Sequence, residues 1–166
     1  MKRRDKRLYN VILPLWLLLA VPPLVLLVIP ANLAVDCLVL LLTLAWMKRG
    51  EKAAVLRRLW WKFWLLGFAA DAVGAAWMFL GVLPGIKLTW WSDTVGRIMY
   101  NAFSHPAALL WTLAGVVLAG VCIYFFDRRA MASCALLTAR ERHQIALSMA
   151  VFTAPWLFFV PTLWYF

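Results

Sequence analysis

The chain has 166 residues, of which 66% are hydrophobic, and it carries a formal net charge of +10. Soluble domains are about 45–50% apolar, so this composition excludes an ordinary soluble fold. The charge would indicate nucleic-acid binding in a soluble protein, but Lys and Arg are also retained in the cytoplasmic loops of membrane proteins. We therefore expect no nucleic-acid partner. The expected partners are the bilayer and the anionic lipid headgroups on its cytoplasmic side.

Basic residues mark the loops that share one side of the membrane. All but two of the 17 Lys and Arg residues fall in three clusters, at residues 2–7, 48–62 and 128–142. The exceptions, Lys87 and Arg97, lie in one long loop. A cytoplasmic N-terminus followed by an odd number of crossings, about five, places all three clusters inside and the C-terminus outside. The sequence therefore predicts an all-α integral membrane protein, a bundle of about five transmembrane helices.

Long apolar runs give the predicted spans in chain order. Residues 8–47 are almost uninterruptedly apolar, and one helix of that length would extend roughly 60 Å, twice a hydrocarbon core of about 30 Å. We expect the chain to turn at Pro30, which disfavours helix at the preceding residue, and at Asn32, which tolerates turns. A single polytopic membrane domain, residues 1–166, then has spans at about 8–29, 33–47, 59–83, 106–126 and 144–166.

Local signals place the ends of the later spans. The third span is expected to stop before Pro84, which cannot continue a helix. Ser104 is a candidate cap for the fourth span, with Pro106 in its first turn, where the missing donor costs nothing. Thr138 and Glu141 have the spacing of a capping box, so the fifth helix should begin one to two turns before its apolar run.

The loop between residues 84 and 105 carries the pattern of a short helix. Apolar residues recur at helical spacing, with polar residues on the opposite face. The apolar positions are Val95, Ile98, Met99, Ala102 and Phe103, and the polar ones are Asp93, Arg97 and Asn101. We expect a short helix in the outer interface. A connector packed on the bundle is the alternative that we favour over a lid across a substrate path.

Two ionisable residues lie within the apolar runs, Asp36 in the second predicted span and Asp71 in the third. A charged side chain at the bilayer centre costs about 2.5–3.5 kcal/mol on insertion scales, so such residues face the bundle or a cavity. If the two spans pack together, the carboxyls could share a proton and serve as a proton or cation site. Alternatively, one carboxyl hydrogen-bonds a carbonyl freed by proline, Asp36 reaches the outer headgroups, or a partner subunit supplies an intramembrane cation.

Small residues indicate where two helices can approach closely. The third predicted span contains Gly67, Ala70 and Gly74, and the fourth contains Gly115 and Ala119. Because small side chains let backbones come together in lipid, we expect the tightest helix contact between these spans. The contact could lie within one chain or between the copies of a homo-oligomer.

Signals for catalysis are weak. His105 and His143 fall on opposite sides of the membrane in this topology and cannot share a site. The three cysteines have no metal-ligand spacing, and the sequence has no zinc-protease, nucleophile-elbow or phosphate-loop motif. We therefore predict no catalytic residue, no cofactor and no metal site.

The sequence favours a multi-pass protein of the plasma membrane that is not an enzyme. The first hypothesis is an accessory or scaffold subunit of a membrane complex, because the chain is short and carries packing glycines. The alternative is a small proton- or cation-coupled transporter or channel that acts as an oligomer. In that case Asp71 and Asp36 would be its ion sites.

Overall fold

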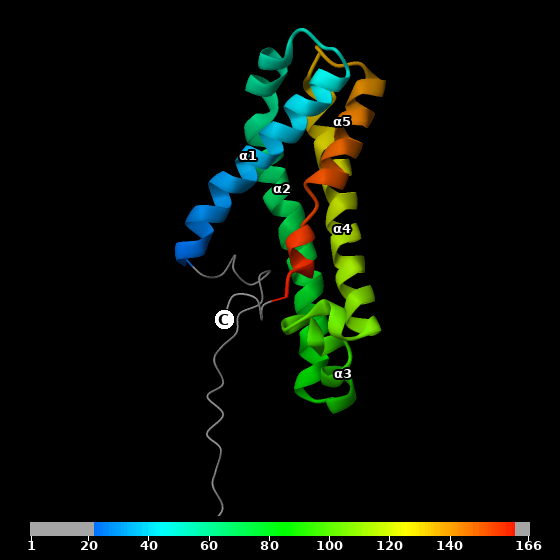
Figure 1. The fold of residues 1–166 in the computed structure, drawn as a ribbon. Coiled ribbons are helices and arrows are strands. Elements are labelled where there is room, and N and C mark those ends of the chain that lie inside the picture. The colour runs from blue at the N-terminus through cyan, green and yellow to red at the C-terminus, as the bar shows by residue number, and fades with distance from the viewer. Residues whose placement is uncertain (1–21, 162–166) are drawn as a thin grey trace, which may run out of the picture.

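The computed structural model describes residues 22–161, and these are arranged as a bundle of helices with no strand (Figure 1). Three helices are long and apolar enough to cross a membrane. They are α1 (Pro22–Trp46), α2 (Lys52–Val82) and α4 (Pro106–Ala130). A shorter helix, α5 (Ala139–Phe152), packs beside them. The predicted all-α class is confirmed for the described residues, and the three long helices indicate a membrane protein.

The predicted turn at Pro30 is wrong, because α1 passes through this residue without a break. The spans predicted at 8–29 and 33–47 therefore share one helix from Pro22 onward. Proline removes one backbone hydrogen bond, but a reversal in lipid would leave several backbone groups without partners. A continuous helix through Pro30 therefore costs less free energy than a turn within the lipid. Residues 1–21, with the first basic cluster and the predicted start of the first span, lie outside the described residues.

The helices α2 and α4 form the long axis of the bundle (Figure 1). α2 begins about two turns before the predicted residue 59 and ends at Val82, just before Pro84. α4 begins at Pro106 as predicted, but its cap is His105, whose Nδ1 accepts a hydrogen bond from the Ala107 N–H at 3.1 Å. α4 also continues about one turn past the predicted end at 126, and this brings one more acidic residue into the helix.

The last predicted span, 144–166, is not one helix. α5 opens with the predicted capping box and ends at Phe152. Pro155 lacks the N–H that would bond the carbonyl of Val151, and the indole Nε1 of Trp156 donates to that carbonyl instead, at 2.9 Å. The break is therefore tolerated because a side chain satisfies the carbonyl that proline leaves free.

The segment after this break enters the half of the bundle nearer α3. It forms a short 3-10 helix, η6 (Trp156–Phe159). Phe158 is buried in the core of that half, and the ring of Phe159 lies 5.9 Å from the ring of Phe103 in the α3–α4 connection. The chain from α5 to η6 thus runs along the bundle from the end where α5 begins towards the α3 end, as far as the level of Gly74.

The connection between α2 and α4 is a series of short turns rather than the single interfacial helix that we predicted. Its elements are η2 (Leu83–Ile86), α3 (Thr89–Asp93), η3 (Val95–Met99) and η4 (Ala102–Ser104). Thr94 and Asn101 interrupt the helical backbone. Val95, Ile98 and Ala102 are buried, whereas Phe103, expected on the same face, is 61% exposed. The segment is therefore a connector packed on the bundle, which was our alternative to a single helix in the outer interface.

Two apolar cores fill the bundle. The core at the end where α1, α2, α4 and α5 meet includes Leu40, Leu44, Leu59, Phe63, Ile123, Ile145 and Met149. The core nearer α3 contains Met78, Ile98, Ala108, Val116, Ala154 and Phe158. Small residues let α2 and α4 cross closely: a Cβ on Gly74 would lie 3.1 Å from the Cβ of Ala119 and 3.3 Å from the carbonyl oxygen of Gly115. Ala70 is buried on the same helix.

Candidate functional site

Three aspartates from three helices lie inside the bundle: Asp36 on α1, Asp71 on α2 and Asp127 on α4. Asp36 is 3% exposed and Asp127 is 1% exposed, and one carboxylate oxygen of Asp71 is also buried. Helical spacing explains these positions. On α4, Asp127 continues the buried face formed by Val116, Ala119, Gly120 and Ile123.

Asp36 is the middle member of this group. Its carboxylate interacts electrostatically with those of Asp71 and Asp127. It packs against α2 at Gly67, where a Cβ would lie 3.5 Å from Asp36 Oδ2. Gly67 thus contacts Asp36 on α1, about two turns along α2 from the crossing with α4 at Gly74. The structure therefore joins the two predicted aspartates with a third, and we refer to Asp36, Asp71 and Asp127 as the carboxyl cluster.

The carboxyl cluster is short of hydrogen-bond partners. Asp36 Oδ2, Asp71 Oδ1 and Asp127 Oδ2 are buried, and none of them has a donor among the side chains and backbone groups that the structure describes. The one salt bridge among the described residues, Arg49–Glu141, involves none of them. Buried polar groups are normally paired, and an uncompensated buried charge is expensive. These three oxygens therefore mark a place where the fold gives up stability.

The cluster does not have the geometry of a metal site. Within residues 22–161, no group of three His, Cys, Asp or Glu side chains is placed to hold a metal ion. One proton shared between neighbouring carboxyls relieves their repulsion.

Asp127 was missed at the sequence level. It precedes Arg128 and Arg129, and this run of charge resembles a cytoplasmic loop. Helical periodicity was the available signal, because Asp127 lies four residues after Ile123 and seven after Gly120 on the apolar face. The two arginines that follow it are exposed, as helical rotation requires.

The loops with the second and third basic clusters lie at one end of the bundle, which we call the basic end. A tight turn after α1 lies at this end. α1 ends at Trp46, and Lys48 in the turn that follows has a left-handed backbone with φ of 55°. The N–H of Lys48 bonds the Ala45 carbonyl at 3.0 Å and that of Arg49 bonds the Leu44 carbonyl at 3.1 Å, which is the Schellman pattern. This turn directs Arg49 to α5, where its Nε donates to Glu141 Oε1 at 2.6 Å and its Nη2 donates to Oε2.

Glu141 also forms the predicted capping box. Its Oε2 accepts hydrogen bonds from the backbone N–H and the hydroxyl of Thr138, each at 2.8 Å. The Arg49 guanidinium and the Thr138 donors lower the pKa of Glu141 from 4.5 to about 2. Glu141 is thus fully paired, in contrast to the carboxyl cluster, and its role is to join the two basic loops.

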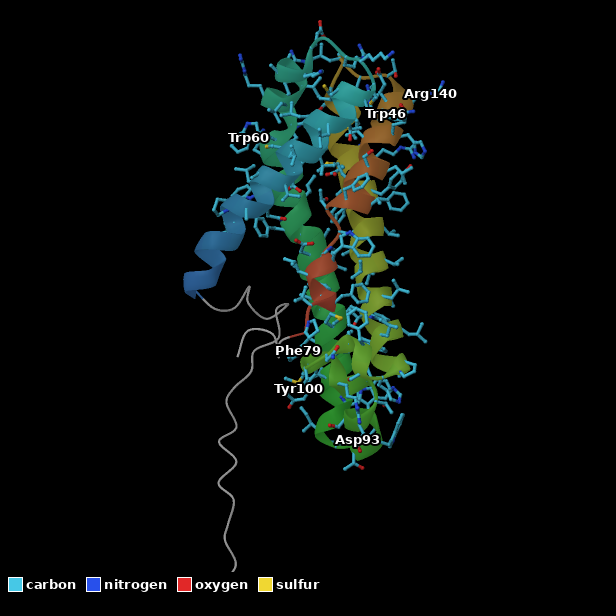
Figure 2. All side chains as sticks on the ribbon, viewed as in Figure 1. Trp46, Trp60, Phe79, Asp93, Tyr100 and Arg140 are labelled. Carbon is cyan, nitrogen blue, oxygen red and sulfur yellow. The ribbon has the colours of Figure 1, made fainter. Side chains whose placement is uncertain are left out.

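The two histidines lie at opposite ends of α4. His105 caps the helix next to the α3 end. His143 is in the first turns of α5, where its Nδ1 lies 2.8 Å from the hydroxyl of Tyr124. Figure 2 shows the same separation between Arg140 at one end of the bundle and Asp93 at the other. The histidines therefore form no common site.

Comparisons of this chain with protein-family models, curated proteins and solved structures found no match. Its class is defined by the structure alone: an all-helical protein with three helices able to cross a membrane and three aspartates gathered between them.

Proposed function

We propose that this protein is a multi-pass membrane protein that binds and moves protons, and that the carboxyl cluster is its working site. The observation that supports the proposal is that Asp36, Asp71 and Asp127 come from three separate helices, each with a buried oxygen that has no donor within the described part of the chain. Intramembrane carboxyls are typical of proton relays in pumps and transporters. In this proposal the protein is not an enzyme and has no cofactor.

The order of the cluster gives the proposed route. Asp127 lies about one turn from the basic end of α4, Asp36 interacts with it, and Asp71 interacts with Asp36 in turn. A proton that enters from the basic end would therefore pass from Asp127 to Asp36 and then to Asp71. From Asp71 to the end of α2 at Val82 is roughly 16 Å of helix. This stretch packs in the apolar core near α3, and a conformational change would be needed to release the proton there.

Proton flux into vesicles tests the proposal. The purified full chain is reconstituted in liposomes that contain a pH-sensitive dye, and a pH gradient is applied with the membrane potential clamped. We expect uptake above that of protein-free vesicles. Asp36→Asn should lower it by about tenfold or more, since it breaks the relay at its middle member. Asp93→Asn is the matched control, because Asp93 is exposed at the opposite end of the bundle. Equal flux in the wild type and Asp36→Asn would refute the relay.

Thermal stability separates a functional cluster from a structural one. Asparagine has nearly the same shape as aspartate but no charge, so Asp36→Asn relieves repulsion with both neighbours. An unpaired buried charge carries a desolvation penalty, and removing the charge relieves it. We expect the unfolding temperature of Asp36→Asn to rise in detergent. A fall would mean that the carboxylate holds the helices together and would support a structural role.

The accessory subunit predicted from the sequence is the second candidate. An open apolar groove of about 430 Å³ runs between α1 and α5, and Thr43 and Ser148 line it together with Leu42 and Phe152. Small hydroxyl residues favour helix association in lipid, so this groove could receive a helix of a partner or of a second copy. Reconstitution without proton flux, together with a stable oligomer or a co-purifying membrane protein, would support this candidate.

The proposed location is the plasma membrane, with the basic end in the cytoplasm. The loops that carry the second and third basic clusters meet at one end of the bundle through the Arg49–Glu141 ion pair. The retention of Lys and Arg in the cytoplasm supports this orientation. A reporter that is active only in the cytoplasm, inserted after Gly50, should be active, and the same reporter inserted after Asp93 should be silent.

A further inference from the structure

A second groove runs along the outer surface between α4 and α5. Its volume is about 480 Å³, and it is lined by side chains that are exposed and apolar. On α4 these are Val117, Val121 and Phe125, spaced by four residues, and on α5 they are Leu147 and Val151. Gly120 lines the groove and lets the two helices approach closely: a Cβ there would lie 3.1 Å from the Ala150 carbonyl oxygen.

The end of this groove at the basic side carries three linked polar side chains. Tyr124 and His143 line the groove themselves, and their hydroxyl and Nδ1 lie 2.8 Å apart. Arg128 donates from Nη1 to the Tyr124 hydroxyl at 3.0 Å, and its guanidinium lies 5.9 Å from the centre of the Tyr124 ring. The tyrosine thus holds the arginine over the mouth of the groove, with further guanidinium N–H groups available as donors.

The dimensions of the groove match one leaflet of a bilayer. Along α4 its lining extends from Val116 to Phe125, nine residues that span roughly 14 Å of helix, compared with about 15 Å for half a hydrocarbon core. The Arg128 guanidinium at the headgroup level and the apolar groove below it complement a phosphate group that is attached to acyl chains. Arginine is the side chain best suited to bind phosphate through two parallel hydrogen bonds.

We propose that one anionic phospholipid from the leaflet at the basic end binds in the α4–α5 groove. Arg128 holds its phosphate, Tyr124 and His143 position that arginine, and an acyl chain lies along Val121 and Leu147. The charge at the mouth selects a lipid over a partner helix in this groove, since an apolar helix surface has no group for the guanidinium. This inference is independent of proton transfer at the carboxyl cluster.

Lipid titration of single variants tests the proposal. The full chain is purified in mild detergent, and phosphatidylglycerol is added while bound lipid is counted by native mass spectrometry. We expect one phosphatidylglycerol to bind more tightly than phosphatidylcholine. Arg128→Gln should weaken phosphatidylglycerol binding about tenfold, the loss expected for one charge-assisted hydrogen bond. Arg129→Gln is the matched control, because it removes the same charge one residue away and should change binding less than about twofold.

Two further variants test the positioning group and the slot. Tyr124→Phe removes only the hydroxyl that holds Arg128 and should weaken binding of the anionic lipid alone. Val121→Trp should fill the slot and weaken both lipids, whereas Leu110→Trp, on an exposed part of α4 outside the groove, should weaken neither. Equal losses in Arg128→Gln and Arg129→Gln would overturn the proposal in favour of diffuse charge attraction. Equal binding of the two lipids by the wild type would also overturn it, as would a protein partner displacing the lipid.

Discussion

The indole N–H of Trp77 on α2 donates to the backbone carbonyl of Trp111 on α4, and the indole N–H of Trp111 donates to the carbonyl of Trp77, each at 3.1 Å. The two rings are stacked with centroids 4.6 Å apart. This reciprocal pair lies on the α3 side of the crossing at Gly74 and Gly115. It fixes the height of α2 relative to α4, because a shift along the axis would break both bonds.

Removing either indole donor should destabilise the helix pair. Trp77→Phe and Trp111→Phe each keep an aromatic ring but lose one hydrogen bond, at a cost of about 1 kcal/mol. The double variant should lose less than the sum, because the rings also interact with one another. Unfolding in a denaturing detergent series measures the three variants. Trp60→Phe, at an exposed position on α2, is the control and should behave as the wild type.

Gly81 is required by the same aromatic group. A Cβ at this position would overlap the Trp111 indole and would lie 2.9 Å from Ile98 Cδ1. The Gly81 carbonyl also accepts a hydrogen bond from Trp91 Nε1 at 2.8 Å. Gly81→Ala should therefore destabilise the protein by about 1–3 kcal/mol, the usual cost of overpacking. Gly50→Ala has open space and should have a much smaller effect on the unfolding midpoint. Similar unfolding midpoints for Gly81→Ala and Gly50→Ala would contradict the close packing at Gly81.

The left-handed turn at Lys48 is a site where glycine should improve stability. A side chain at φ of 55° is strained, and glycine adopts this conformation without a steric penalty. Lys48→Gly should raise the unfolding free energy by about 1 kcal/mol. Lys48→Ala removes the charge but keeps the Cβ, so it should give no gain. A gain of the same size in both variants would assign the effect to charge instead of backbone conformation.

The Arg49–Glu141 pair should make stability depend on acid pH. The pKa of Glu141 is lowered from 4.5 to about 2 by Arg49, so the folded state favours the ionised form. The pair therefore contributes stability above pH 4.5, and this contribution is lost as the pH falls from 4.5 towards 2. Glu141→Gln keeps a side chain that suits the capping box but removes the charge.

The measurement is the difference in unfolding midpoint between the wild type and Glu141→Gln as a function of pH. Comparing the two proteins cancels the titration of every other carboxyl. We expect a constant difference above pH 4.5 that disappears near pH 2. A difference that persists in strong acid would show that the capping hydrogen bonds, and not the ion pair, account for the effect of Glu141.

The prolines show how far the local sequence predicts where the helices of this fold break. The sequence predicted a turn at Pro30 and a continuous helix through Pro155, and the structure has the reverse. Proline weakens a helix to a similar extent at both positions. The outcome depends on what surrounds it: Trp156 takes the carbonyl freed at Pro155, and Phe158 beyond the break enters the core near α3.

The carboxyl cluster likewise combines features that the sequence predicts with contacts that it does not predict. The sequence by itself determined that Asp36 and Asp71 lie in apolar helices, that Thr138 and Glu141 open a helix, and that α4 begins at Pro106, because these depend on composition and on neighbours within a few residues. Only the tertiary structure decided that Asp127 joins the two aspartates and that Arg49 meets Glu141. Such contacts depend on the rotation and height of packed helices, which are set by shape complementarity at positions such as Gly74 and Trp77. The amino-acid sequence alone does not directly show the rotation and height of one helix relative to another.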